Sequence, residues 1–346
     1  MSRLPALGLP ARAGRRTNLG LLGLLMVAAA TGVLAYGVGT VGAARVVTAV
    51  HGAAGLGLLL LAPWKSVIVR RALQRRLSPV AVGLGLLVTL TVVTGVLHAA
   101  GVSGLGAPVS VLAVHVGAGV CVLPLLVGHA WGRRQRPRRT DLSRRVLLQS
   151  GGLVMGAAAV WTAGETLWRV TGVPGARRRA TGSLERGTDN PAAMPVTQWF
   201  TDTVPDSVPS TLLLTDGAHS LRVPMSELTS SETVRAALDC TGGWYAVQDW
   251  SGIRLDRLLA GRLSGIPADG SIDVISGTGY RRRFPLGDAG HLLLATSAGG
   301  QPLSAGHGGP VRLVAPGRRG FWWVKWVTRL EVVDEPWWWQ PPFPLH

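Results

Sequence analysis

A cysteine beside two glycines is the first residue of this sequence whose type and setting could do chemistry. Cys240 lies in residues 238–259 (LDCTGGWYAVQDWSGIRLDRLL), just before Gly242 and Gly243, and is one of two cysteines in the chain. Glycines allow a bulky ligand to approach the backbone closely. We therefore interpret Cys240 as a metal thiolate; the alternative is a small buried hydrophobic residue.

A second stretch combines basic residues with glycines and tryptophans. Residues 307–326 (HGGPVRLVAPGRRGFWWVKW) contain Arg312, Arg318, Arg319 and Lys325. This composition suits a large planar anion that carries phosphate, and the alternative is a solvated basic face. Together with Cys240, the stretch predicts one cofactor site.

The composition combines charge with apolar character. The 346 residues are enough for two domains, with a net charge of +17 and a mean hydropathy of +0.30. The basic residues cluster between apolar runs without a nucleic-acid-binding motif, so we predict no nucleic-acid partner. Cys121 lies inside an apolar run, so no disulfide framework is expected.

Five apolar runs predict an all-α transmembrane bundle of about five helices in residues 1–164. Each run approaches the length of about 20 residues that a helix needs to cross a bilayer. Basic residues border the runs on alternate sides, which places the N-terminus in the cytoplasm and everything after the fifth run outside a plasma membrane. The runs are 18–40, 46–64, 79–101, 108–131 and 146–163. The inside charges are Arg3, Arg12, Arg15, Arg16, Lys65, Arg70, Arg71, Arg75, Arg76 and those of residues 133–145.

Arg144 and Arg145 begin the motif R-R-V-L-L-Q just before the fifth run. The motif is similar to a twin-arginine export signal placed internally, and the alternative is an ordinary basic stop at a helix end. The twin-arginine route carries folded proteins, which suits a domain that receives its cofactor in the cytoplasm. We therefore predict export of the folded C-terminal domain.

The remainder divides into a linker and a β-rich domain. Residues 165–190 are rich in Gly, Arg, Thr and Pro without periodicity, which predicts a linker. Residues 191–346 then form the predicted extracytoplasmic domain. Its expected strands are 212–215, 221–223, 272–276, 280–284, 292–296, 311–315 and 327–333, and its expected short helices are 226–232 and 255–260.

Three motifs in this domain resemble the molybdopterin-binding domain of the sulfite oxidase family. They are C-T-G-G-W from Cys240, W-S-G-I-x-L-x-x-L-L from Trp250, and H-G-x-P-V-R-L-V-x-P-G-x-x-G-F-W-x-V-K-W from His307. The resemblance covers roughly residues 198–334. It implies an α+β, β-rich sulfite-oxidase-type fold and a molybdenum–molybdopterin cofactor.

The resemblance also assigns roles to single residues. Cys240 would complete the coordination of a molybdenum already held by the dithiolene of the pterin. Arg312 and Lys325 match P-V-R and V-K-W and would bind the pterin or its phosphate, with Arg318 and His307 as second choices. Glycines would let backbone amides reach the cofactor. These cofactor-binding glycines are Gly242, Gly309 and Gly317.

One departure from the family bears on the substrate. Where sulfite oxidases carry arginines shortly after the ligand cysteine, this chain has Gly243, Trp244 and Tyr245. The pattern favours the bacterial periplasmic relatives that reduce sulfoxides on methionine over the enzymes that oxidise sulfite. Tyr280 is the candidate catalytic donor to an oxyanion, and we interpret the arginines of residues 281–283 as a solvated strand face.

Three histidines in the apolar runs predict a second centre. His51, His98 and His115 fall near the predicted outer ends of their runs, and ionisable residues inside a membrane are functional candidates. His51 and His115 would ligate a haem b, with His98 as the alternate ligand. Polar contact between helices is the competing interpretation.

The sequence thus predicts a membrane-anchored, molybdopterin-dependent oxidoreductase that transfers oxygen atoms outside the membrane. Its substrate would be a small molecule, a sulfoxide or an oxyanion. Its electrons would be exchanged with the lipid bilayer through haem and quinone, or with a cytochrome. The alternative is a non-catalytic, membrane-tethered binding module that keeps the fold.

Overall fold

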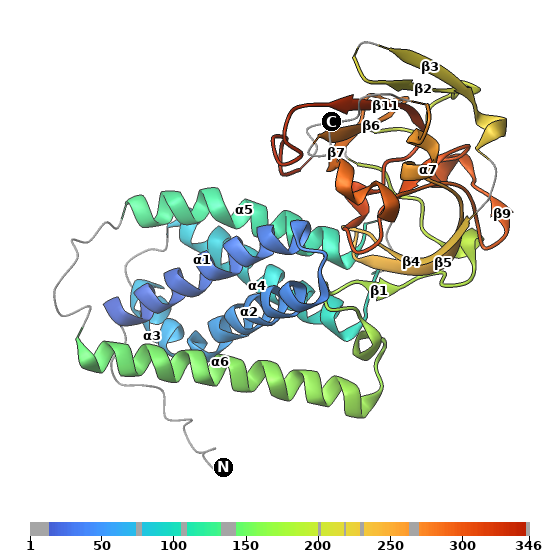
Figure 1. The fold of residues 1–346 in the computed structure, drawn as a ribbon. Coiled ribbons are helices and arrows are strands. Elements are labelled where there is room, and N and C mark those ends of the chain that lie inside the picture. Colours follow the sequence, from blue (N-terminus) through green and yellow to red (C-terminus); the bar gives the residue numbers. More distant parts are fainter. Residues whose placement is uncertain are drawn as a thin grey trace. The chain divides into compact units, whose positions relative to one another are not determined.

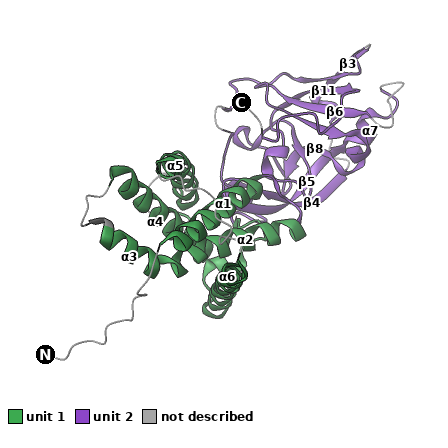
Figure 2. Ribbon diagram, turned by 90° about the vertical axis from the view of Figure 1, so that its left-hand side faces the viewer, with its two compact units in different colours: residues 1–36, 41–184 green, residues 37–40, 185–346 purple. Residues whose placement is uncertain are grey.

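The chain divides into a helical unit and a β-rich unit. The computed structural model describes residues 14–73, 78–104, 109–132, 143–199, 202–217, 219–228, 232–262 and 270–343. Unit 1 comprises Met1–Tyr36 and Val41–Leu184, and unit 2 comprises Gly37–Thr40 and Glu185–His346 (Figure 2). The main boundary therefore falls inside the predicted linker.

Six helices are described in unit 1 (Figure 1). They are α1 (Arg15–Gly37), α2 (Val41–Leu60), α3 (Ala62–Leu73), α4 (Pro79–Ala100), α5 (Val111–Trp131) and α6 (Arg144–Thr171). All except α3 are long and apolar enough to cross a membrane by length and composition. The twelve-residue α3, with Arg70 and Arg71 in its last turn, was not predicted.

The beginning of the predicted linker is helical, contrary to expectation. Helix α6 continues through Glu165 and Arg169 to Thr171, and Gly172 ends it in the left-handed conformation with φ of 66°. The apolar run stops at Ala163, but charged residues near a helix end keep the backbone hydrogen bonds. Hydropathy alone therefore ended the predicted helix too early.

The segment after α6 packs on the helices of its own unit. Arg178 forms an ion pair with Glu165, and its Nη1 donates to the carbonyl of Gly175 at 2.7 Å. The Thr48 hydroxyl donates to the carbonyl of Ala180 at 2.9 Å. These contacts fix residues 174–182 on unit 1, where we had expected an irregular linker.

Close helix packing in unit 1 depends on glycine. A Cβ atom at Gly52 of α2 would lie 1.9 Å from the Trp161 ring of α6, and one at Gly57 would lie 3.3 Å from Ala157 Cβ. Small residues let the helix backbones approach each other, as is common in membrane bundles.

The charge pattern that predicted the orientation lies partly outside the described residues. The charges concerned are Arg3, Arg12, Arg75, Arg76 and those of residues 133–142.

Unit 2 is built on two sheets. The first has the order β1-β5-β8-β10, with β4 paired to β5 and β9 to β8, and the second has the order β3-β2-β11-β6-β7. All pairings of the second sheet are antiparallel except β2 with β11. The strands are β1 (Leu184–Glu185), β2 (Thr211–Thr215), β3 (Ser220–Pro224), β4 (Glu232–Asp239), β5 (Trp244–Arg254), β6 (Ser271–Ser276), β7 (Arg281–Pro285), β8 (Leu293–Ala298), β9 (Gln301–Pro302), β10 (Arg312–Val314) and β11 (Val327–Val333).

The seven predicted strands all appear, but the hairpin that carries Cys240 was missed. Strands β4 and β5 flank the Cys240 turn, and in β5 Trp244, Ala246, Gln248 and Trp250 are buried on alternate positions. The buried Gln248 breaks the apolar half of that alternation, which hid the strand. Its amide donates to the carbonyl of Gly187 at 2.5 Å.

Of the two short helices predicted in this unit, one is observed. The α7 helix (Leu255–Leu259) matches prediction. The helix expected at 226–232 is wrong, because Met225–Glu227 form a single 3-10 turn and Glu232 already begins β4. Residues 229–231 lie outside the described part of the chain.

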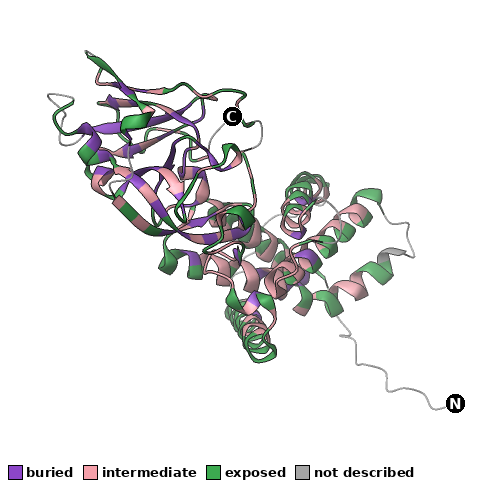
Figure 3. Ribbon diagram, turned by 90° about the vertical axis from the view of Figure 1, so that its right-hand side faces the viewer, coloured by how far each residue is buried: buried purple, intermediate pink, exposed green. Residues whose placement is uncertain are grey.

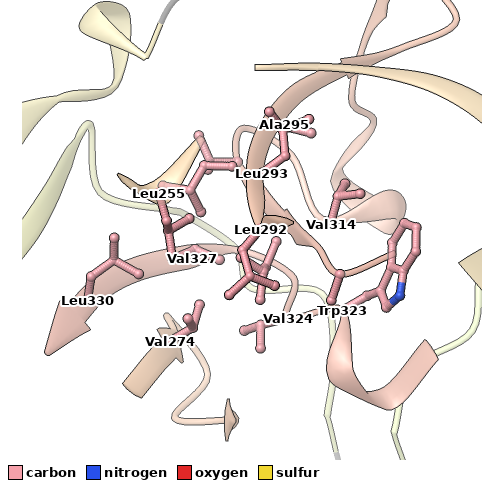
Figure 4. Packing of buried hydrophobic residues seen from close by; sticks show 14 of the residues in the cluster. Leu255, Val274, Leu292, Leu293, Ala295, Val314, Trp323, Val324, Val327 and Leu330 are labelled. Atoms are coloured by element: carbon pink, nitrogen blue, oxygen red, sulfur yellow. The ribbon is translucent and has the colours of Figure 1, made fainter. Parts of the chain in front are cut away.

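The core of unit 2 is formed by apolar side chains from strands, α7 and loops. Leu255, Leu292, Val314, Trp323 and Leu330 pack together in it (Figure 4). Burying each such side chain contributes about 1.5–3 kcal/mol. Most buried positions lie in unit 2, whereas the unit 1 helices are mostly exposed or half-buried (Figure 3).

Candidate functional site

Cys240 occupies the turn between β4 and β5. The Gly243 amide donates to the Cys240 carbonyl at 3.1 Å, and Gly243 has a φ of 84°, which favours glycine. Within this turn the Gly242 amide donates to the Cys240 sulfur at 3.3 Å. Neither Cys240 nor Cys121 is in a disulfide. The turn therefore holds the thiol of Cys240 in a fixed position without consuming it.

Arg319 ties the second basic stretch to this turn. Its buried guanidinium forms an ion pair with Asp239 and donates to the Cys240 carbonyl at 3.3 Å. A Cβ atom at the neighbouring Gly320 would lie 3.0 Å from Cys240 Cα. The two stretches that the sequence joined into one predicted site are thus in contact.

Thr197 links the cysteine to a half-buried lysine. Its hydroxyl lies 3.3 Å from the Cys240 sulfur, and its carbonyl accepts a hydrogen bond from Lys325 Nζ at 2.8 Å. Lys325 also donates to the carbonyl of Gly306 at 2.6 Å. Burial and the neighbouring Arg312 together lower the pKa of Lys325 to about 7, against the opposing charge of the Cys240 thiolate.

Arg312 is the most deeply buried cation of the site. Its side chain stacks between Trp250 and Trp323, 5.1 and 5.6 Å from the ring centres, and donates to the carbonyl of His307 at 3.0 Å. Desolvation lowers the pKa of Arg312 to about 10, and the charge of Cys240 opposes that shift. The Arg312 Nε has no hydrogen-bond partner among the described residues.

Arg282 is a buried cation that sequence reasoning placed on the wrong side of its strand. Arg281 is exposed and Arg283 pairs with Asp273 at 2.8 Å, but Arg282 is only 2% exposed and lies 4.1 Å from the Trp322 ring centre. The solvated strand face expected for residues 281–283 is therefore wrong. Burial lowers the pKa of Arg282 to about 10.

The three cations Arg282, Arg312 and Lys325 share an unusual property. None has a carboxylate within ion-pair distance in the part of the chain that the structure describes. A buried charge without a partner costs several kcal/mol. Their positions therefore fit a bound anion, and Cys240 adds a soft ligand suited to a redox metal.

Two other predicted site residues, Tyr280 and His307, form hydrogen bonds within the protein. The Tyr280 hydroxyl donates to the Phe321 carbonyl, and burial raises the pKa of its phenol. His307 uses Nδ1 with the Ser304 hydroxyl at 2.8 Å and Nε2 with the Met194 carbonyl at 3.1 Å. Burial lowers the pKa of His307. As placed here, both side chains shape the site without presenting a free polar group to a ligand.

Arg318 and the glycines lie around the same segment. Arg318 pairs with Asp288 at 2.8 Å, so its charge is compensated. A Cβ at Gly309 would lie 2.2 Å from the Leu303 carbonyl, which makes Gly309 a packing requirement. Gly317 has a φ of 78° with open space around it, which suits a backbone approached by a ligand.

The three candidate haem histidines all belong to unit 1. The rings of His51 and His115 have centres 5.8 Å apart and are nearly perpendicular, at 83°. His98 does not take part in this ring pair, and its Nε2 lies 3.2 Å from the carbonyl of Gly182. His51 is midway along α2 and not near its outer end, because the helix begins at Val41.

Comparisons with known proteins find similarity within the β-rich unit. Residues 213–339 match the family described as the oxidoreductase molybdopterin binding domain. Mitochondrial sulfite oxidase of Drosophila melanogaster is 34% identical over 122 residues, which are 32% of this chain and 21% of that protein. Human mitochondrial sulfite oxidase is 33% identical over 126 residues, 32% of this chain and 22% of that protein.

Two further relatives extend the comparison. Nitrate reductase of Hordeum vulgare is 34% identical over 96 residues, covering 24% of this chain and 11% of that protein. The solved sulfane dehydrogenase SoxCD of Paracoccus pantotrophus is 26% identical, with a TM-score of 0.34, and the overlap covers 36% of this chain and 38% of that one. The chain thus spans about a fifth or less of the curated relatives named here. Residues 213–339 thus match a molybdopterin-binding domain model, and part of the chain is similar to sulfite oxidases and nitrate reductases.

Proposed function

We propose that the protein is a membrane-anchored, molybdenum-dependent oxidoreductase whose C-terminal unit transfers an oxygen atom to or from a small substrate outside the membrane. The observation that carries this proposal is a set of three cations without acidic partners among the described residues of unit 2. Arg282 and Arg312 are buried, and the half-buried Lys325 is joined to Cys240 through Thr197. An anionic cofactor compensates these charges, and a thiolate ligates its metal.

Different side chains hold different parts of this cofactor. Arg312 and Lys325 bind its anionic groups by charge-assisted hydrogen bonds. Cys240 ligates the metal, and Arg319 positions Cys240 through Asp239 and the Cys240 carbonyl. When bound, the cofactor supplies a metal that exchanges two electrons with the substrate.

The residues after Cys240 favour a neutral sulfoxide as substrate. Trp244 and Tyr245 stand where the resemblance to sulfite oxidases implies arginines, and Trp244 is buried in the core. Sulfoxide reduction consumes two electrons and two protons and yields a sulfide and water, with the electrons supplied by a quinol in the membrane or by a cytochrome. Without a cation at these positions, an oxyanion such as sulfite loses a charged hydrogen bond worth about 1.5–3 kcal/mol.

Steady-state kinetics with both substrates test this specificity. We expect kcat/KM for reduction of methionine sulfoxide with a dye reductant to exceed kcat/KM for oxidation of sulfite by about tenfold or more, which corresponds to 1.4 kcal/mol. A free-enzyme preparation lacking molybdenum serves as the blank. Faster turnover of sulfite would overturn the sulfoxide assignment while leaving the cofactor assignment in place.

The membrane anchor rests on the helices of unit 1. Five helices have the length and composition of spans, and large apolar side chains such as Leu86, Val127 and Met155 are 67%, 61% and 72% exposed. Apolar side chains on the outside of a bundle suit lipid. The N-terminus is then cytoplasmic and unit 2 is outside, reached through the twin-arginine route.

A reporter fusion tests this topology. A reporter fused after Gly172, where α6 ends, should be active only outside the membrane. Changing Arg144→Lys together with Arg145→Lys should leave it inside or degraded, whereas Arg138→Lys with Arg139→Lys is the matched control that keeps the charge and spares the motif. Unchanged export of the Arg144/Arg145 variant through the general secretory route would contradict the twin-arginine assignment.

A further inference from the structure

His51 and His115 form a ring pair within the helices of unit 1. His51 lies on α2 and His115 on α5, and their ring centres are 5.8 Å apart. The sequence could place each histidine on its helix, but the contact between them is a property of the fold. The pair is surrounded by apolar helices and is remote in sequence from the motifs of unit 2.

Each ring is oriented by a backbone carbonyl of the helix that precedes it. His51 Nδ1 lies 2.9 Å from the carbonyl of Ala28 in α1, and His115 Nδ1 lies 2.8 Å from the carbonyl of Thr91 in α4. A carbonyl only accepts hydrogen bonds, so each Nδ1 must carry the proton. The Nε2 of each ring is then the unprotonated nitrogen that can bind a metal, the arrangement common among metal-ligating histidines.

Neither Nε2 has a hydrogen-bond partner within the described ranges of the chain. Both nitrogens are therefore available to a ligand. Two such nitrogens on adjacent rings therefore indicate a ligand that both rings share.

Two glycines hold the rings against the helices. A Cβ atom at Gly95 of α4 would lie 2.9 Å from His115 Cε1, and one at Gly32 of α1 would lie 3.3 Å from His51 Cε1. The same helices thus supply both the carbonyl that orients each ring and the space that the ring occupies. The positions of both rings are fixed by α1 and α4.

The number of protein ligands selects the kind of metal centre. The described residues hold no group of three or more His, Cys, Asp or Glu side chains that could bind a metal ion, whereas bare zinc or copper sites in proteins use three or four such ligands. A haem brings four nitrogens of its own and needs only two axial ligands. Metal–nitrogen bonds of about 2.0 Å, plus about 1.1 Å from each nitrogen to its ring centre, would separate the two ring centres by about 6 Å.

We propose that His51 and His115 are the two axial ligands of one b-type haem in unit 1. The observed separation of 5.8 Å is close to the separation that such a pair requires. His98 does not take part in the ring pair of His51 and His115, so it is not one of the two proposed ligands. The site goes beyond the proposed function and is independent of molybdenum in unit 2.

Absorbance of the full-length protein in detergent, expressed with added haem precursor, tests the site. We expect about one haem per chain and a reduced spectrum with the sharp bands of a six-coordinate low-spin b-type haem. The haem should be lost from His51→Ala and from His115→Ala. The matched controls His98→Ala and His129→Ala, on the neighbouring helix α4 and on α5 itself, should keep it.

A second variant separates loss of a ligand from loss of the fold. His115→Met keeps a potential axial ligand, so it should retain haem with a raised reduction potential, as methionine–histidine ligation does. A wild-type protein without haem, or haem that survives both alanine substitutions with an unchanged spectrum, would overturn the proposal. Molybdenum measured on the same samples distinguishes this failure from failure of the proposed function.

Discussion

Cys240→Ser is expected to lower turnover by more than about 100-fold, because changes even to the residues that support metal ligands cost 10–100-fold. Serine keeps the shape of the turn but replaces a soft thiolate with a hard oxygen donor. Arg312 and Lys325 are unchanged in this variant, so the pterin should remain bound. The measurements are kcat with methionine sulfoxide, the pterin content and the molybdenum spectrum.

Cys121→Ser is the matched control for this prediction. Cys121 is exposed on α5 and belongs to unit 1, so its substitution should leave turnover and the molybdenum spectrum unchanged. Full activity in Cys240→Ser, or an identical metal spectrum, would show that Cys240 is a structural residue of the β4–β5 turn.

Arg312→Met should separate cofactor binding from stability. Removing one partner of a buried charged contact costs about 2–5 kcal/mol, so affinity for molybdopterin should fall by about 30-fold or more. The apoprotein should unfold at nearly the same temperature, because relief of an uncompensated buried charge offsets the lost hydrogen bonds to the His307 and Trp323 carbonyls. Pterin fluorescence and thermal unfolding of the detergent-extracted chain measure the two effects.

Arg329→Met is the control for this second prediction. Its side chain is 46% exposed on β11 and lies 3.9 Å from Glu331, so its substitution should alter neither pterin affinity nor stability appreciably. If Arg312→Met bound the pterin with wild-type affinity, the charge of Arg312 would not serve to bind the cofactor, and the prediction would be wrong. An apoprotein that unfolds would mean that Arg312 is mainly a packing residue between Trp250 and Trp323.

The sequence predicted the composition of the site better than its geometry. Cys240, Arg312 and Lys325 stand out by residue type, and their motifs place them on one domain. Thr197, which contacts both Cys240 and Lys325, carries no local signal, because the contact joins residues far apart in the chain. Only the fold brings such residues together.

Arg282 shows a signal that sequence reasoning could have used. Strand side chains alternate between two faces, so Arg282 shares a face with Phe284, an aromatic residue expected to be buried. In the structure both are buried, at 2% and 0% exposure. Three consecutive arginines suggest a solvated face only when this alternation is ignored.

The number and approximate positions of the long helices in unit 1 could be predicted from the sequence, because apolar runs define these helices. Their ends were less predictable, since Arg45 lies inside α2 and Glu165 inside α6. Pairing of His51 with His115 could not be derived from spacing, because it depends on which helices pack together. Hydropathy carries no information about that choice.

The molybdenum and pterin content of the purified full-length chain tests the central claim most directly. After expression in a host that makes the cofactor, we expect about one molybdenum and one pterin per chain in the wild type, the stoichiometry of a single cofactor site. Arg312→Met analysed in parallel should contain little of either. A wild-type protein that is folded and exported but free of molybdenum would contradict the account and favour a non-catalytic, membrane-tethered binding module.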